Sequence, residues 1–283
     1  MKKLFVLLLL LGVASSAWAS TDWLSTAASS DWFTAANWSN GVPSSTLVTN
    51  TRTYGGNANA SFMPVISGAA ASAHQLDIGG SSQAGTLQVP PIVGSVTLNS
   101  GASLTVTDYI RIGSSSSSNR WGFFYMNGGT LNVNNYLSVG YGTGVLAVKG
   151  SMKMVDGTVN VVNAFTIGLS ANTSGYMDMD GGTINAGDFA MKVTASTWSP
   201  IVELDISGGK IVITGDKRIK VAGEKNDLYD WIDAGWIKTN GTAWEDYANV
   251  SYDAGTNKTT IIPEPATLCL LGLGALSLIR RKR

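Results

Sequence analysis

The sequence predicts an all-β protein, a right-handed parallel β-helix with three short strands per coil, terminal caps, an N-terminal signal helix and a short C-terminal transmembrane helix. Three observations support this fold: a repeat of nearly constant length through the middle of the chain, an export signal at its start, and a proline-flanked apolar segment at its end. We divide the chain into a signal peptide (1–19), an N-terminal cap with the first strands (20–67), β-helix repeats (68–222), a C-terminal cap and linker (223–262) and a sorting segment (263–283).

The first 19 residues have the organisation of a secretory signal peptide. A short positive start at residues 1–3 precedes an unbroken apolar run at 4–13, and Ala17 and Ala19 form a small-x-small cleavage site before Ser20. The apolar run is too short to span a bilayer, which needs about 20 residues. We therefore expect Sec-dependent export and a mature protein that begins near Ser20.

The middle of the chain repeats one pattern, which begins with a glycine pair and ends with an aliphatic residue followed by glycine. Equivalent aliphatic positions are separated by steps of 27, 28, 25 and 27 residues, and they are Leu104, Leu131, Val159, Ile184 and Ile211. A further strand with alternating apolar residues precedes each glycine pair, which gives three short strands per repeat. No amphipathic helical stretch lies between these strands.

A single repeat cannot bury enough apolar surface to offset the entropy of ordering its chain, so the repeats must stack. Stacking at about 4.8 Å pairs each strand with its copies in the coils above and below. It predicts about six coils over residues 68–222, with inward ladders of Met, Leu, Ile and Phe and an outward row of Asn132, Asn160 and Asn185. An antiparallel β-sandwich would fit the strand spacing as well.

Both ends of a solenoid expose strand edges, so we expect caps. Trp23, Trp32 and Trp38 precede the repeats, and further tryptophans, Trp231, Trp236 and Trp244, follow them. We interpret these residues as the cores of two caps, although tryptophans scattered through an ordinary core would give the same distribution. A short capping helix is predicted at 230–237.

The C-terminal segment combines three elements in a fixed order. Pro263, Glu264 and Pro265 are followed by an apolar run at 266–279 and then by a basic cluster at 280–283. Fourteen helical residues extend only about 21 Å, shorter than a hydrocarbon core of about 30 Å, which suits a temporary anchor. The positive-inside rule would keep the basic cluster in the cytoplasm and the rest of the chain outside.

These residues resemble the PEP-CTERM sorting signal, in which a Pro-Glu-Pro tripeptide precedes a short apolar helix and an arginine-rich tail. The matching residues are Pro263, Glu264 and Pro265, with Arg280 and Arg281 in the tail. The resemblance implies recognition and cleavage by an exosortase in bacteria that usually make extracellular polysaccharide. An ordinary C-terminal anchor is the alternative. The repeats are similar to the passenger repeats of autotransporter-type surface proteins, and this likeness concerns architecture rather than activity.

Composition excludes several classes of function. Without the six basic residues and one acidic residue of the two end segments, the 19 basic and 19 acidic residues leave a net charge of about −5, so nucleic acid is an unsuitable partner. The lone Cys269 and the lone His74 exclude an intramolecular disulfide, a Cys-based zinc site and a multi-histidine metal site. No phosphate-binding glycine motif occurs, and we expect no cofactor.

One outward row deserves a functional hypothesis. Alignment on the glycine pairs places Lys153, Asp178 and Asp205 side by side, and adjacent coils would hold the two carboxylates about 5 Å apart. That separation suits the carboxylate pair of a retaining glycosidase, and Lys153 could act as the base of a lyase. A solvated surface row, or a weak contact for sugar or a cation, is the interpretation that we favour.

We therefore expect a non-enzymatic structural or adhesion protein of the cell surface or extracellular matrix, transiently anchored in the inner membrane and associated with exopolysaccharide or biofilm. A polysaccharide lyase or glycoside hydrolase built on a β-helix is the alternative hypothesis.

Overall fold

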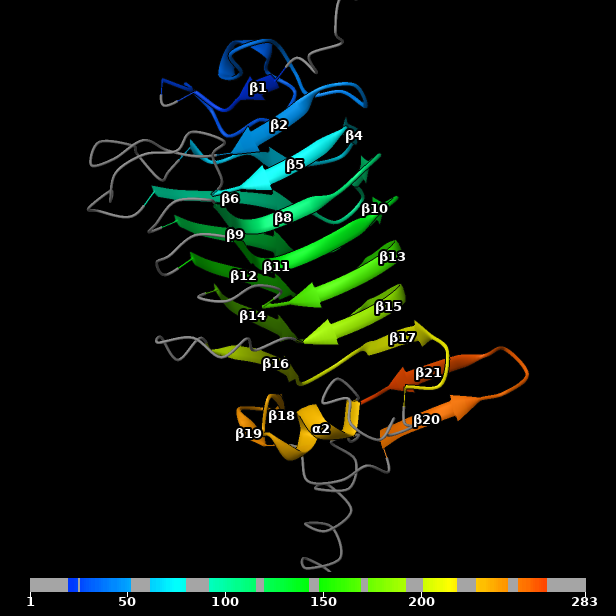
Figure 1. Ribbon diagram of the computed structural model, residues 1–283. Coiled ribbons are helices and arrows are strands. Elements are labelled where there is room, and N and C mark those ends of the chain that lie inside the picture. The colour runs from blue at the N-terminus through cyan, green and yellow to red at the C-terminus, as the bar shows by residue number, and fades with distance from the viewer. Residues whose placement is uncertain are drawn as a thin grey trace, which may run out of the picture.

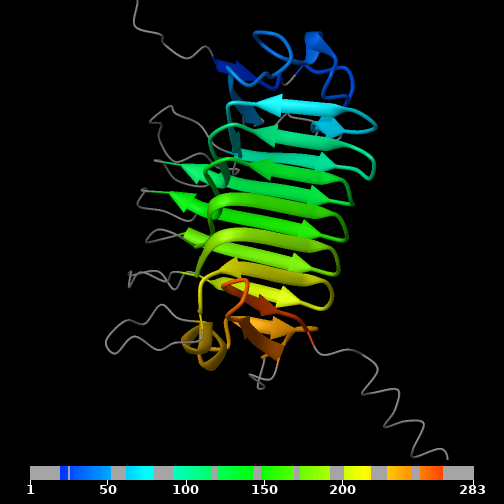
Figure 2. The same cartoon turned by 90° about the vertical axis from the view of Figure 1, so that its right-hand side faces the viewer.

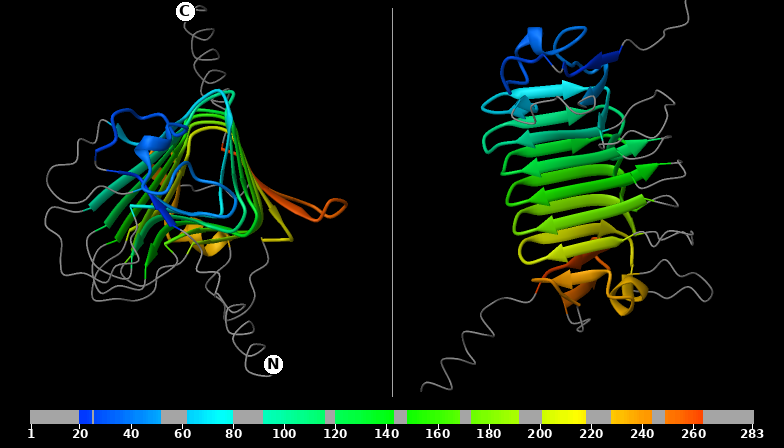
Figure 3. Two further views of the ribbon diagram at one scale, coloured as in Figure 1. Left: turned by 90° about the horizontal axis from the view of Figure 1, so that it is seen from above. Right: turned by 90° about the vertical axis from the view of Figure 1, so that its left-hand side faces the viewer.

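The computed structural model describes residues 20–24, 26–51, 62–79, 92–115, 120–142, 148–168, 173–191, 201–217, 228–243 and 249–263. The described chain winds into a β-solenoid whose strands form two sheets, and the first and last described elements lie at opposite ends of the stack (Figures 1 and 2). Seen along the stack, the strands of successive coils superimpose (Figure 3). The segments 1–19 and 264–283, for which we predict helices, lie outside the described residues.

Among the described residues, the larger sheet has 13 strands. They are β1 (Ser20–Asp22), β2 (Val48–Thr51), β4 (Ala70–Ala73), β5 (Gln75–Ile78), β7 (Ser103–Val106), β8 (Ile110–Ser115), β10 (Thr130–Val133), β11 (Tyr136–Gly142), β13 (Thr158–Ile167), β15 (Thr183–Met191), β17 (Lys210–Thr214), β20 (Val250–Asp253) and β21 (Lys258–Ile261).

The smaller sheet has eight strands in the part of the chain that the structure describes. They are β3 (Val65–Ile66), β6 (Ile92–Leu98), β9 (Arg120–Met126), β12 (Val148–Met154), β14 (Thr173–Met179), β16 (Val202–Ile206), β18 (Ile237–Thr239) and β19 (Thr242–Ala243). Two short helices, η1 (Ala35–Asn37) and α2 (Leu228–Asp233), belong to the segments on either side of the repeats.

The repeat predicted from the sequence is the stacking unit of the fold. Strands of neighbouring coils pair in parallel, and the aliphatic positions that define the repeat are in direct register and fully buried: Leu104, Leu131, Val159, Ile184 and Ile211. An antiparallel sandwich would not give this pairing, so that alternative is wrong.

Parallel stacking places like side chains above one another in the core. One ladder of the smaller sheet runs through Val96, Phe124, Met152, Met177 and Leu204, each of them at most 1% exposed. The predicted inward ladder of sulfur-bearing and aliphatic side chains is thereby confirmed. Because each coil covers the apolar surface of the next, only the two ends of the stack need separate caps.

The strands are less uniform than the repeat suggests. Whereas β10 and β11 are separate, β13 and β15 each run through both of the corresponding positions as one strand. The register between β13 and β15 shifts between Val161 and Ala164, and the extra residue leaves Val162 63% exposed. A β-bulge between Val161 and Ala164 therefore accommodates part of the difference in repeat length.

Glycines allow the two sheets to approach closely where β8 lies against β12. Gly113, which ends one copy of the repeat, has a φ of 68°, and a Cβ placed there would lie 2.1 Å from the carbonyl oxygen of Lys149. A Cβ on Gly150 would lie 2.2 Å from both the carbonyl oxygen of Ile112 and the amide nitrogen of Gly140. Gly113 and Gly150 are therefore required by backbone packing, and Gly113 also by its φ angle.

Buried tryptophans cap the N-terminal end. Trp23 and Trp32 each pack edge-on against Trp38 with ring centroids 4.8 Å apart, and the indole of Trp38 donates to the carbonyl oxygen of Trp32 at 2.8 Å. All three are at most 3% exposed. At the other end, Trp231 of α2 packs edge-on against Phe189. These four tryptophans therefore lie buried at the two ends of the stack, where the caps are predicted, and Trp244 lies outside the described part.

The predicted capping helix is right in kind but wrong in extent. The helix α2 begins at Leu228 and ends at Asp233, and Ile237 already belongs to β18. Gly235 follows with a φ of 70°, a backbone conformation that favours glycine and ends the helix.

Each sheet ends in an antiparallel hairpin at the C-terminal end. Strand β21 pairs antiparallel with both β17 and β20, and β19 pairs antiparallel with β18. The turn between β18 and β19 consists of Asn240 and Gly241, both with positive φ, which is the preferred chemistry of a two-residue hairpin. These hairpins stop the parallel pairing that could otherwise add another chain.

Candidate functional site

The outward row predicted from the sequence exists. Lys153 on β12 is in register with Asp178 on β14, which is in register with Asp205 on β16. Parallel strands hold neighbouring positions about 4.8 Å apart, so the structure brings the three predicted side chains together. Their proposed role as a sugar or cation contact stays a prediction.

Ion pairing within the row occupies the lysine and its closest carboxylates. Lys153 Nζ lies 2.7 Å from Asp178 Oδ2 and 3.1 Å from Asp180 Oδ2. The hydrogen bonds to Asp178 and Asp180 raise the pKa of Lys153, and the contact with Lys153 lowers the pKa of Asp180. A lysine held protonated in this way is a poor general base.

Asp205 is engaged differently from its neighbour. Its Oδ2 accepts a 2.7 Å hydrogen bond from the amide of Gly241, in the turn between β18 and β19. Its Oδ1 is buried and has no hydrogen-bond partner among the described residues. Asp205 therefore anchors a cap hairpin to the row, and the two aspartates do not form a free pair of solvent-facing carboxylates. Within the described ranges, no three His, Cys, Asp or Glu side chains are grouped so that they could hold a metal ion.

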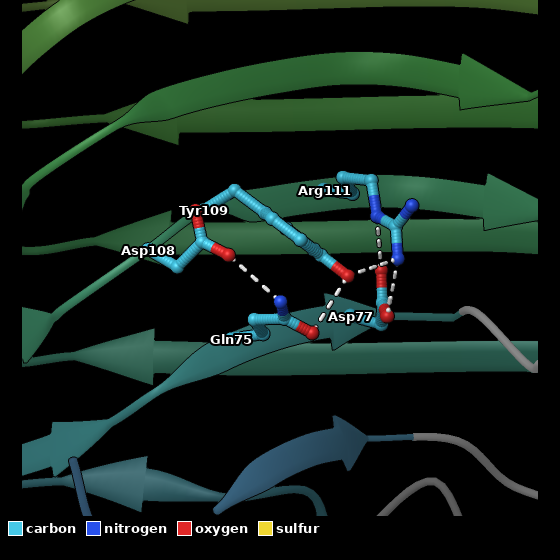
Figure 4. A network of polar contacts seen from close by, with 5 residues as sticks. All are labelled: Gln75, Asp77, Asp108, Tyr109 and Arg111. Atoms are coloured by element: carbon cyan, nitrogen blue, oxygen red, sulfur yellow. Dashed lines mark hydrogen bonds and ion pairs between the residues drawn. The ribbon is translucent and has the colours of Figure 1, made fainter. Parts of the chain in front are cut away.

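A second polar cluster, on the outer face of the larger sheet, was not predicted from the sequence. Arg111 on β8 forms a bidentate ion pair with Asp77 on β5, with its Nε 2.7 Å from Oδ1 and its Nη2 2.8 Å from Oδ2 (Figure 4). The Arg111 guanidinium also donates to the hydroxyl of Tyr109 at 2.6 Å. Tyr109 donates to Gln75, whose amide donates to Asp108.

The cluster extends to the next coils through aromatic and amide contacts. Tyr109 and Tyr136 are stacked with ring centroids 5.1 Å apart, and the guanidinium of Arg111 lies over both Tyr109 and Tyr141. The side-chain amide of Asn135 donates to Asp108 at 2.8 Å. The network therefore ties together neighbouring coils by charge, hydrogen bonds and ring stacking.

Burial and charge shift the titration of this cluster. Burial raises the pKa of Tyr136 to about 12, with the charge of Arg111 opposing the shift. Burial, followed by the charge of Asp77, also raises the pKa of Tyr109. Burial lowers the pKa of Arg111, but the hydrogen bond and charge of Asp77 outweigh it, so that pKa is raised overall. The cluster thus holds its tyrosines neutral and its arginine charged, a structural arrangement rather than an activated one.

Sequence spacing could have revealed this cluster. Asp77 and Arg111 are 34 positions apart but lie in direct register, beside the paired positions Leu76 and Ile110. Alignment on the glycine pairs alone does not identify the first coil, because its repeat lacks that pair. Aligning the last strand of each repeat would have placed Asp77 beside Arg111.

An asparagine ladder runs along the larger sheet. The amide of Asn160 donates to Oδ1 of Asn132, and the amide of Asn185 donates to Oδ1 of Asn160, both at 2.9 Å. The predicted row of stacked amides is confirmed. Next to its C-terminal end, a cavity of about 240 Å³ is lined by residues that include Asn160, Asn185 and Lys258. Its lining consists of amides, aliphatic side chains, one threonine and one lysine, without an acid and base pair.

His74 has a structural contact. Its Nδ1 lies 3.0 Å from the hydroxyl oxygen of Thr107 on the neighbouring coil.

The last described residues connect the fold to the sorting segment. Strand β21 ends at Ile261, and the amide of Ile262 still donates to the carbonyl oxygen of Asn249 at 3.1 Å. Residues 262–283 match the family model described as the PEP-CTERM protein-sorting motif. The chain carries a PEP-CTERM sorting motif.

The PEP-CTERM motif is a signal for export that is recognised by exosortase. It begins directly after the last strand of the solenoid, and Pro263 is buried at that boundary. The other predicted sorting residues, Glu264, Pro265, Arg280 and Arg281, lie outside the described residues. So do Ala17 and Ala19 of the predicted cleavage site, whereas Ser20 is the first residue of β1.

No curated protein matches the chain, and no solved structure matches it. In the part of the chain that the structure describes, no helix is both long and apolar enough to cross a bilayer.

Proposed function

We propose that this PEP-CTERM protein is a non-enzymatic structural or adhesion protein of the cell surface or extracellular matrix, associated with exopolysaccharide or biofilm. In this proposal the chain is exported by the Sec machinery and held transiently in the inner membrane, and exosortase then removes its C-terminal segment. We also propose that the solenoid is right-handed with three strands per coil and that both ends of the chain form helices. The chain would then divide into the five segments defined above.

One observation carries the non-enzymatic part of the proposal. The carboxylates of the outward row are each bound to a neighbour, Asp178 to Lys153 and Asp205 to the amide of Gly241. A hydrolase would need one protonated acid beside one free carboxylate, and neither Asp178 nor Asp205 is placed for such a division of roles.

The position of the motif supports a role as a surface structure. Because the motif begins directly after β21, an anchored chain would hold the C-terminal hairpins near the membrane. The tryptophan cap lies at the opposite end of the stack and would face away from it (Figure 2). A stack of hydrogen-bonded coils suits a stiff spacer between a membrane and a matrix.

A polysaccharide lyase or glycoside hydrolase is the second candidate. It is favoured by the register of Asp178 and Asp205, whose strand spacing of about 4.8 Å is near the separation in retaining glycosidases.

Binding and cleavage of a polysaccharide panel, scored separately, distinguish the two candidates. We expect the exported protein to bind without releasing oligosaccharides, and we expect sugar binding to stay largely unchanged in a variant with both Asp178→Asn and Asp205→Asn. Release of oligosaccharides by the wild-type protein, abolished in that variant, would establish the enzyme instead.

A further inference from the structure

One strand of the smaller sheet presents a line of aromatic side chains outward. Trp121, Phe123 and Tyr125 alternate with the buried residues of β9, and we call these three residues the aromatic strip. The rings of Phe123 and Tyr125 are nearly parallel, with 4° between their planes and 6.3 Å between their centroids. Tyr125 is 40% exposed, and the other two are half-buried.

The repeat itself does not require aromatic residues at these positions. The strand before β9 places Ser95 and Thr97 in register with Phe123 and Tyr125, and the strand after it places Ser151 and Lys153 there. These neighbours have the same backbone pairing and the same outward direction. Two polar positions of the common pattern are therefore aromatic in this coil, at the cost of leaving apolar surface in contact with water.

Polar side chains flank Phe123 and Tyr125 on both sides, whereas Trp121 lies between Val93 and Lys149. Hydroxyl groups of Ser95 and Thr97 lie on one side and that of Ser151 on the other. Lys149, in register with Trp121, holds its ammonium 4.8 Å from the centre of the indole ring and forms no ion pair among the described residues. An apolar line between hydroxyls and a cation is amphipathic across its width.

The dimensions of the strip favour a narrow, extended occupant. Three alternate residues of one strand extend over about 14 Å, and the flanking strands lie about 4.8 Å to either side. A stable protein partner needs about 1,200 Å² or more of total buried surface, larger than one strand with its borders provides. A pyranose ring has an apolar C–H face and a rim of hydroxyls, which is the pattern complementary to an aromatic ring bordered by hydroxyls.

We propose that the aromatic strip binds a polysaccharide chain lying along β9, with its pyranose rings stacked on Phe123 and Tyr125 and its hydroxyls bonded to the flanking side chains. This assignment rests on the proposed association with polysaccharide and adds the residues that make the contact. Lys149 would pair with a carboxylate of an acidic sugar, and the ring stacking is common to neutral and acidic chains.

The test is affinity electrophoresis of the full exported protein in gels that contain either hydroxyethyl cellulose, a neutral chain, or alginate, an acidic chain. The variant combines Phe123→Ser with Tyr125→Thr, the residues that β6 carries in the same register, and Tyr125→Thr alone serves as the milder variant. The control is Val162→Thr, which changes an exposed apolar residue on the other sheet. Thermal unfolding checks that each variant is folded.

We expect the double variant to bind about ten- to a hundredfold more weakly, the single variant to bind more weakly by a smaller factor, and the control to bind as the wild type does. If Lys149→Ser weakened binding to alginate alone, the acidic chain would be the ligand. If the double variant lost binding equally in both gels and Lys149→Ser had no such selective effect, the neutral chain would be the ligand.

Wild-type retardation that is unchanged in the double variant would overturn the aromatic strip and leave polysaccharide association intact. Absence of retardation of the wild type in either gel would overturn both the aromatic strip and the proposed association with polysaccharide. If light scattering showed a wild-type dimer that the double variant turned into a monomer, the occupant would be a second copy of the chain and the assignment would be wrong.

Discussion

Arg111 and Asp77 are 34 positions apart, yet they face each other on adjacent coils as a bidentate ion pair whose side chains are 21% and 11% exposed. Removing either partner of such a pair destabilises the protein, because the remaining charge stays partly buried without its counter-charge. The pair also holds Tyr109, so it links the charge of the cluster to its aromatic part.

Replacing Asp77 with Asn should therefore lower the free energy of unfolding by about 2 kcal/mol, since the guanidinium loses its counter-charge. Urea denaturation measures the change. The comparison is Lys217→Ala, which breaks the more exposed pair with Asp188 and should cost less than about 1 kcal/mol. Equal losses in the two variants would contradict a structural role for the Asp77 pair.

Tyr136 should titrate late in alkali. Its pKa is raised by burial from 10.0 to about 12, so the folded state binds this proton more tightly than the unfolded state does. Its contribution to stability is therefore complete below pH 10 and is lost as the pH rises towards about 12. Ultraviolet absorbance of phenolate, compared between wild type and Tyr136→Phe, measures the titration. An ordinary value near 10 would show that the ring is solvated.

Gly150 should not tolerate a side chain. An alanine Cβ there would lie 2.2 Å from two backbone atoms of the neighbouring sheet, which cannot move without disturbing the corner. We expect Gly150→Ala to destabilise the protein by about 3 kcal/mol or more, or to prevent folding. Gly255→Ala is the matched control, because its Cβ would meet only a side-chain oxygen of Asp253 at 3.3 Å. Similar melting temperatures for the two variants would refute the close approach of the sheets.

Breaking the asparagine ladder at its centre should destabilise the protein more than breaking it at its end. Asn160→Ala removes two hydrogen bonds and Asn132→Ala removes one, so we expect losses of about 2 and about 1 kcal/mol. Thermal and urea unfolding of the two variants measure this difference. If both variants unfolded like the wild type, the stacked amides would contribute nothing beyond the exchange of bonds with water.

Processing at the sorting motif should leave the solenoid whole. Strand β21 ends at Ile261 in a ladder with β17 and β20, so cleavage before this point would remove a cap strand. We expect mass spectrometry of secreted protein to recover a peptide that contains residues 258–261 and to find none from Leu268 onward. Replacing Pro263, Glu264 and Pro265 with Ala should keep the intact chain in the cell fraction. An intact C-terminus in the medium would argue against processing.

The stacking of the coils follows from the amino-acid sequence. Equivalent residues at nearly constant intervals, such as Leu131 and Val159, can all be buried only if each coil lies on the one before, because one coil alone has too little core. The same periodicity predicted the ladder of Asn132, Asn160 and Asn185 and the row containing Asp178 and Asp205. The sorting motif needs no periodicity to be found, because its residues are contiguous in the sequence.

The contacts that these side chains make become visible only in the folded protein. Whether Asp178 and Asp205 are free depends on Lys153 Nζ and on the turn at Gly241, and that turn comes from a hairpin outside the repeat. Aligned strands place Asp77 beside Arg111, but the bidentate geometry of their ion pair and its contact with Tyr109 depend on side-chain conformation. Periodicity specifies which positions are neighbours, whereas side-chain conformation and the caps determine which atoms of those neighbours meet.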